Sequence, residues 1–150
     1  MDIDEFIRQR ITEYYWKDDT NCAEASLKIL AEVFEIELNK QVLDAAAGMH
    51  GAGEYGAQCG LVEGVLMFLG IFGKKISLPN IRITSLCREY ASQFEAEFGS
   101  LICSVLRPEG FNSENPPHIC EELTCNATEF AIDFVFCNIQ TVVMENKDNE

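Results

Sequence analysis

Seven cysteines stand among the 150 residues, a high and odd number that fits a framework of paired disulfides poorly. Four of them fall within about the first turn of a predicted helix: Cys22, Cys59, Cys103 and Cys120. The unpaired N–H groups at a helix start carry partial positive charge, which stabilises a thiolate and lowers the pKa of the thiol. A thiolate is both a nucleophile and a metal ligand, so these four are the candidate catalytic and metal-binding residues. They form one site if their helix starts meet at one end of the fold.

Four thiolates allow three kinds of chemistry. They can ligate an iron–sulfur cluster, although they lack the compact cysteine run of a bacterial ferredoxin, so the fold must assemble the site. They can bind zinc, but zinc ligands usually come as close pairs, which these four lack. Two of them can exchange between dithiol and disulfide, which requires only that they lie within bridging distance. The sequence leaves these alternatives open, with zinc the least favoured.

Glycines gather around the second of these cysteines, in the stretch GAGEYGAQCGLVEG. Glycine adopts positive φ and allows the backbone to approach a ligand closely. Four glycines are therefore candidate cofactor-binding positions: Gly51, Gly53, Gly56 and Gly60. The simpler interpretation is a tight loop between helices. Gly60 and Gly64 also share one helix face, which would allow a neighbouring helix to pack against it.

The other thiols and the two histidines carry weaker signals. Cys87 and Cys137 lie inside predicted helices among apolar neighbours, where packing is the simpler role. Cys125 follows Cys120 by five residues and is a spare thiol, because helical neighbours are three or four residues apart. The two histidines, His50 and His118, lie near candidate cysteines and are either thiol-activating bases or ordinary loop and cap residues.

Apolar residues recur at helical spacing along the whole chain, and no strand alternation competes with this pattern. We therefore expect an all-α fold, a compact bundle of about five to six helices forming one domain over residues 1–150, with 145–150 a frayed tail. The first predicted helix covers about 3–17, the second begins after the cap Asn21, and the third begins at Asn39. The fourth covers 58–72 and stops at Gly73, and the fifth covers 81–98 and is closed by Gly99. A short turn holding Cys103 follows, and the last helix begins at about 117.

The charge balance limits the partners. The chain has 11 basic and 25 acidic side chains, a formal net charge of −14, which argues against nucleic acid and anionic membranes. The N-terminal MDIDEFIRQR lacks the pattern of a signal peptide, and the most apolar segment, 61–72, is too short to span a bilayer. The expected location is cytoplasmic and the expected partner is a redox protein. The oligomeric state is not predicted.

Four short motifs together carry a family resemblance. The order NCAEASL, GAQCGLVEG, FGSLIC and HICEELTCNATEF, from about Asn21 to Phe130, resembles the family of redox-active proteins named for the cysteine pattern C_GCAxxG_C_C. The family cysteines map onto the four cysteines already selected. The resemblance implies a small helical protein whose clustered cysteines do redox work.

These observations predict a small cytoplasmic redox protein with four clustered cysteines. The cysteines either hold an iron–sulfur or other metal centre for electron transfer or act by dithiol–disulfide exchange. The alternative is a helical protein-interaction module without redox chemistry, in which the cysteines are structural. In that case replacing Cys22 and Cys59 by serine would leave partner binding intact.

Overall fold

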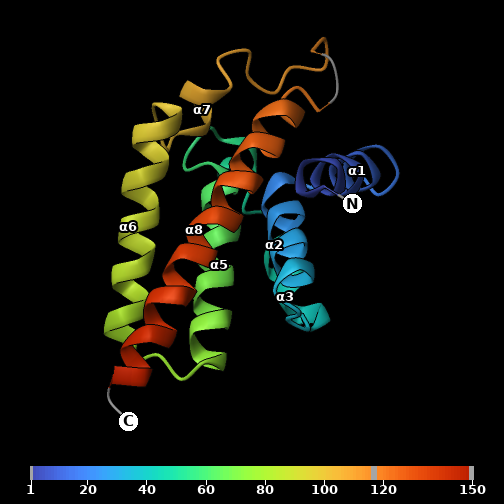
Figure 1. Cartoon of the computed structure of the whole chain (residues 1–150). Helices are drawn as coiled ribbons and strands as arrows, with labels where there is room; N and C mark the ends of the chain where they lie inside the picture. The colour runs from blue at the N-terminus through green and yellow to red at the C-terminus, as the bar shows by residue number, and fades with distance from the viewer. Residues whose placement is uncertain (1, 116–117, 149–150) are drawn as a thin grey trace.

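The computed structural model describes residues 2–115 and 118–148, and in these residues the fold is all-α (Figure 1). The helices are α1 (Ile3–Trp16), α2 (Cys22–Val33), α3 (Lys40–Ala45), α4 (Gly51–Glu54), α5 (Gly60–Lys75), α6 (Asn80–Phe98), α7 (Cys103–Leu106) and α8 (Glu121–Asp148). Three of them are short: α3 has six residues, and α4 and α7 have four residues each. The predicted fold class is therefore confirmed.

The long helices α2, α5, α6 and α8 lie side by side, and α1 crosses the end of α2 that lies near the start of α8 (Figure 1). Helix α2 packs most extensively on α5, and α1 packs on α8. The apolar side chains between these helices form one buried core. Among the described residues, none of the helices combines the length and the apolarity that spanning a bilayer requires.

Side-chain caps and glycine set several helix ends where the sequence predicts them. The side chain of Asn21 accepts a hydrogen bond of 2.9 Å from the backbone N–H of Glu24, at the start of α2. Asn39 caps α3 in the same way through Gln41. Helix α6 ends at Gly99, whose φ of 91° is in the left-handed region.

Two predicted boundaries are wrong. Gly73 does not stop α5, because it keeps helical geometry and is buried against Ile83, where a Cβ would lie 2.7 Å from Cγ1 of Ile83. The helix continues to Lys75 with Ile76 as its C-cap, and the φ of 64° at Ser77 then allows Leu78 N–H to donate to the carbonyl of Gly73.

The last helix begins later than predicted. His118 has a φ of 56°, so the chain turns there and α8 starts at Glu121 instead of near residue 117, a residue that lies outside those described. At the other end the helix continues to Asp148, and residues 149 and 150 of the expected tail also lie outside the described residues.

Two glycines of α5 bring it into close contact with α2, as their shared face predicts. A Cβ on Gly64 would lie 2.4 Å from the backbone oxygen of Ala23 and 2.4 Å from Oγ of Ser26. A Cβ on Gly60 would lie 2.4 Å from Sγ of Cys22. Helices α2 and α5 can therefore approach this closely only because both positions lack a side chain.

The packing at Gly64 leads to a stability prediction. We expect Gly64→Ala to lower the free energy of unfolding by about 1–3 kcal/mol, because the backbone of Ala23 cannot move aside for the new methyl group. Gly70→Ala is the matched control in the same helix, since a Cβ there meets no atom within 4 Å. It should raise stability by up to about 1 kcal/mol through helix propensity. Urea denaturation followed by circular dichroism measures both, and equal effects of the two variants would contradict the prediction.

Candidate functional site

All four candidate cysteines line a single pocket of about 440 Å³. Each comes from a different helix start: Cys22 is the first residue of α2, Cys59 caps α5, Cys103 is the first residue of α7, and Cys120 directly precedes α8. These helix starts meet at the end of the bundle that carries α7, at the top of Figure 1. All four are free thiols.

The glycine-rich segment forms a left-handed turn beside this pocket. Residues Gly51 to Glu54 all have positive φ, between 55° and 70°, and the N–H of Gly56 closes the turn on the carbonyl of Gly51 at 2.9 Å. A Cβ on Gly51 would lie 3.0 Å from both Cβ and Sγ of Cys103. Glycine at this position therefore makes room for a pocket cysteine, as well as adopting an unusual backbone conformation.

The other glycines selected from the sequence differ in their surroundings. A Cβ on Gly56 would lie 3.1 Å from Cβ of Ser104, and Gly60 lies against Cys22. Gly53 has open space around it and supplies only its positive φ. Gly51, Gly56 and Gly60 therefore fit the chain around the cysteines and their neighbours. Binding of a cofactor by these glycines stays a prediction.

Backbone hydrogen bonds hold Cys59 and Cys103 together. The N–H of Cys59 donates to the carbonyl of Leu101 at 2.8 Å, and the N–H of Cys103 donates to the carbonyl of Ala57 at 2.7 Å. Between them, Gln58 and Ile102 form an isolated antiparallel bridge. Two segments that are more than 40 residues apart in the sequence thus present their cysteines to the same pocket.

Cys120 is positioned by hydrogen bonds to its own backbone. Its carbonyl accepts from both the N–H and the hydroxyl of Thr124, at 2.8 and 2.9 Å. The single hydroxyl proton of Thr124 is used in this bond, so the buried Tyr15 hydroxyl, 2.7 Å from Oγ1 of Thr124, must be the donor in their contact. Tyr15 of α1 therefore helps to fix the start of α8.

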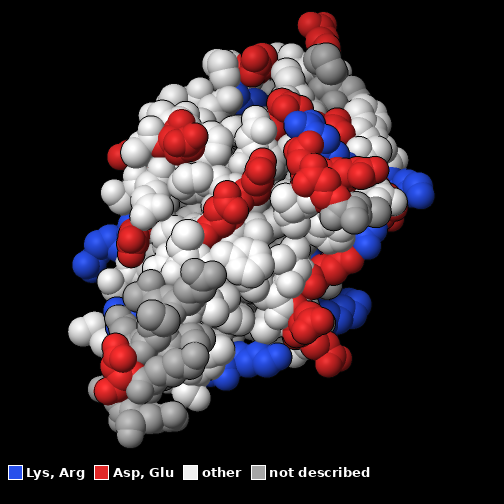
Figure 2. Space-filling view, viewed as in Figure 1, with Lys and Arg blue, Asp and Glu red and all other residues white. Residues whose placement is uncertain are grey.

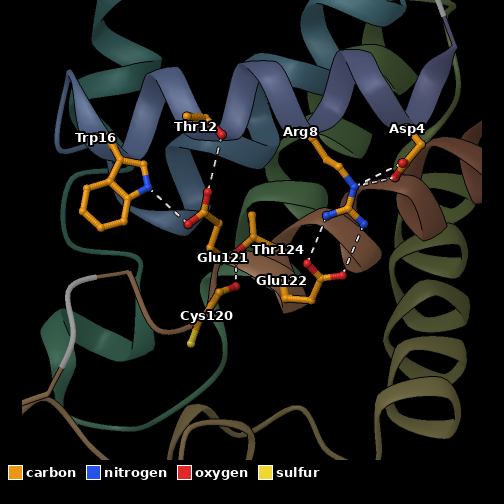
Figure 3. A network of polar contacts seen from close by, with 8 residues as sticks. All are labelled: Asp4, Arg8, Thr12, Trp16, Cys120, Glu121, Glu122 and Thr124. Atoms are coloured by element: carbon orange, nitrogen blue, oxygen red, sulfur yellow. Dashed lines mark hydrogen bonds and ion pairs between the residues drawn. The ribbon is translucent and has the colours of Figure 1, made fainter.

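The exposed side of this helix start is also tied to α1 (Figure 3). The indole Nε1 of Trp16 donates to Glu121 at 3.2 Å. Arg8 forms a two-pronged contact with Glu122, at 3.0 and 3.2 Å, and also pairs with Asp4. These exposed contacts help to orient Glu121 and Glu122, the residues that follow Cys120. Each contact contributes little to the stability of the fold by itself.

Burial dominates the electrostatics of the four thiols. It raises the pKa of Cys22 well above the usual range of a thiol, and the nearby Cys59 raises it further. Burial also raises the pKa of Cys59 to about 12. The backbone N–H groups of Leu61 and Val62 act in the opposite direction and lower this pKa. The Cys59 side chain makes no capping hydrogen bond at the start of α5. The expectation that helix starts lower the pKa of these thiols is therefore wrong, because desolvation outweighs the helix dipole.

Arg107 is a cation that lines this pocket, and it is absent from the residues predicted from the sequence. Burial raises the pKa of Cys103 and of Cys120, but the guanidinium of Arg107 lowers both. Its Nε donates to the carbonyl of Gly110 at 2.9 Å, and the guanidinium lies over the Phe111 ring, 4.1 Å from the ring centroid. A signal was present, since Arg107 is the only Lys or Arg between Arg88 and Lys147.

Both histidines line the pocket. His118 stacks on Tyr15 with 4.8 Å between ring centroids, and its Nε2 lies 3.7 Å from Asp19. His50 lies with Nε2 3.9 Å from Glu54, while its Nδ1 is buried without a hydrogen-bond partner. The remaining thiols do not line this pocket: Cys87, Cys125 and Cys137.

The pocket brings sulfur and nitrogen donors together. Four thiols and an unpartnered buried nitrogen of His50 surround the pocket. Within residues 2–115 and 118–148, however, no three His, Cys, Asp or Glu side chains lie close enough to hold a single metal ion.

The position of Arg107 predicts the reactivity of Cys120. Arg107→Gln removes the charge that lowers the pKa of Cys120, so this pKa should rise and less thiolate should be present at any pH below it. We expect alkylation of Cys120 by iodoacetamide in the reduced, metal-free protein to slow several-fold, and its pH profile to move to higher pH. Site-resolved mass spectrometry measures both.

Two variants control this experiment. Arg107→Lys keeps the charge and should retain most of the rate. Arg88→Gln removes an exposed cation on α6, away from the pocket, and should leave the alkylation of Cys120 unchanged. If Arg107→Gln and Arg88→Gln gave the same Cys120 profile, the proposed influence of Arg107 would be wrong.

Residues 20–134 match the sequence profile of a family described as "Putative redox-active protein (C_GCAxxG_C_C)". The matched region covers more than half of the chain and contains all four pocket cysteines. No curated protein and no solved structure gives a significant match. The resemblance noted in the sequence is confirmed, and the chain belongs to the C_GCAxxG_C_C family of redox-active proteins.

Proposed function

We propose that this protein is an electron carrier in which Cys22, Cys59, Cys103 and Cys120 hold an iron–sulfur cluster. The observation that carries the proposal is the convergence of four free thiols, each from a different helix start, around one pocket. Cysteine thiolates are the usual ligands of such clusters. When bound, a cluster supplies reversible one-electron transfer.

The raised pKa values of these thiols favour a ligand role over a free nucleophile. A buried thiol such as Cys22 holds its proton at neutral pH and attacks slowly. A metal ion, by contrast, deprotonates a coordinating thiol outright, so burial does not prevent ligation. In the proposed holoprotein Arg107 and backbone N–H groups at the helix starts would offset the negative charge of the sulfurs.

Cluster content is the test of this function. Protein purified without oxygen should contain iron and acid-labile sulfide in stoichiometric amounts and should absorb visible light. Serine in place of any one of the four pocket cysteines should lower the iron content several-fold. Cys87→Ser is the matched control, because Cys87 is a half-buried thiol on α6 outside the pocket. It should retain the full content.

Metal-free native protein would refute the cluster and leave a second function, dithiol–disulfide exchange. The placement of Arg107 beside both Cys103 and Cys120 favours these two as the reacting pair. In this step the thiolate of one attacks a disulfide of the partner. The other cysteine then displaces the partner's sulfur, so the protein gains a disulfide and the partner gains two thiols. A Cys103–Cys120 disulfide in peptide maps of the oxidised protein would support it.

The acidic surface suggests the charge of the partner. Acidic side chains predominate over the upper part of the face in Figure 2, and the whole chain has a formal net charge of −14. Two acidic residues that line the pocket, Asp19 and Glu54, have largely exposed side chains. We therefore expect a redox partner with a basic docking surface, steered by these charges.

A basic electron acceptor tests this expectation. Electron transfer from the reduced protein to a basic cytochrome c should slow as salt is added, because salt screens the attraction. The double variant Asp19→Asn, Glu54→Gln should react several-fold more slowly at low salt and depend less on salt. Stopped-flow absorbance measures the rates. Identical salt dependence of the native and variant proteins would exclude docking through these two residues.

A further inference from the structure

Three large apolar residues are exposed on the segments that carry Cys59 and Cys103. Tyr55, Ile102 and Val105 are 89%, 41% and 60% exposed. None of the three lines the four-cysteine pocket, although Cys103, which does, directly follows Ile102. A single exposed apolar residue needs no explanation, but a group of three beside a proposed redox centre does.

Backbone contacts hold these three residues in one patch. The N–H of Ser104 donates to the carbonyl of Gly56 at 3.1 Å, and a Cβ on Gly56 would lie 3.1 Å from Cβ of Ser104. Tyr55 and Val105 are the chain neighbours of this touching pair. The N–H of Val105 donates to the carbonyl of Ile102 at 3.0 Å, so these two are neighbours at the start of α7. We call Tyr55, Ile102 and Val105 the apolar patch.

The charges around the apolar patch follow the pattern of a protein interface. Residues 55–62 and 98–106 contain no charged side chain, in a chain with 11 basic and 25 acidic ones. Asp19 and Glu54, which line the adjoining pocket, have exposed carboxylates, whereas Arg107 of the same pocket is half-buried. Loss of charge at the centre with charge at the rim is typical of interfaces. An acidic rim favours a partner whose own rim is basic.

We propose that the apolar patch is the docking surface for the redox partner, a protein whose apolar contact site is surrounded by basic side chains. This inference rests on the proposed redox function and names the surface that its partner covers. A partner seated on the patch lies beside Cys103, because the patch and this cysteine share α7 and the residue before it. Apolar contacts then determine how long the partner stays, whereas the acidic rim determines how fast it arrives.

The test compares Tyr55→Ser and Val105→Ser with Ile81→Ser. Ile81 is 78% exposed at the start of α6, at the end of the bundle away from α7 (Figure 1). Electron transfer from the reduced protein to a basic cytochrome c should slow several-fold in both patch variants at every salt concentration, because neither changes a charge. Ile81→Ser should react like the native protein. Ferricyanide, a small oxidant that needs no docking surface, should oxidise all four proteins at one rate.

A binding measurement separates docking from the redox function. Titration calorimetry with zinc-substituted cytochrome c, whose metal takes up no electron, measures docking even if the native protein holds no iron. Binding that is several-fold weaker in both patch variants, and unchanged in Ile81→Ser, supports the docking surface with or without a cluster.

Three results would overturn the docking surface. The first is native-like binding and electron transfer in both patch variants, which leaves the redox function intact. The second is a native protein that does not bind zinc-substituted cytochrome c. The third is a native dimer in sedimentation that Val105→Ser converts to a monomer, because a second copy of the chain would then cover the patch.

Discussion

The close approach of α2 and α5 is the constraint on which the site depends. With a Cβ at Gly60 or Gly64, the two helices would have to separate, and Cys22 and Cys59 would separate with them. Helix α5 gives up helix propensity at both positions, about 1 kcal/mol each, to permit this contact. In the left-handed turn that starts at Gly51, the absence of a side chain likewise leaves room for Cys103. Glycine in this chain thus determines how closely the cysteines gather.

The pKa values of the four pocket thiols are raised, whereas their positions at helix starts alone would predict lowered values. Burial removes the water that would stabilise a thiolate, and neighbouring sulfurs repel one another when charged. Only Arg107 acts against this on Cys103 and Cys120. A pocket of this kind discourages free thiolates, and this is one reason why we propose that its sulfurs act as metal ligands. Arg107 also makes one side of the pocket the more reactive one.

Much of the fold was predictable from local signals, and much of the site was not. Asn21, Asn39 and Gly99 mark helix ends through chemistry within a few residues, which is visible in the sequence. The predicted helix end at Gly73 is wrong because this glycine is kept for a tertiary contact with Ile83, which the local sequence does not reveal. The helix starts selected four cysteines that the structure places around one pocket, and their functional role stays a prediction. Their raised pKa values and the role of Arg107 depend on burial and on contacts between distant segments, which no local pattern contains.

Two buried side-chain atoms of the described residues lack a hydrogen-bond partner. Elsewhere the chain partners its buried polar groups locally, as Ser26, Thr124 and Thr128 do with backbone carbonyls three or four residues before them. Among the described residues the exceptions are Nδ1 of His50, which lines the four-cysteine pocket, and the hydroxyl of Tyr90, which lies in the hydrophobic core. The pocket therefore contains one buried nitrogen that no neighbouring group of the described residues satisfies, which agrees with the ligand-holding role that we propose for its four thiols.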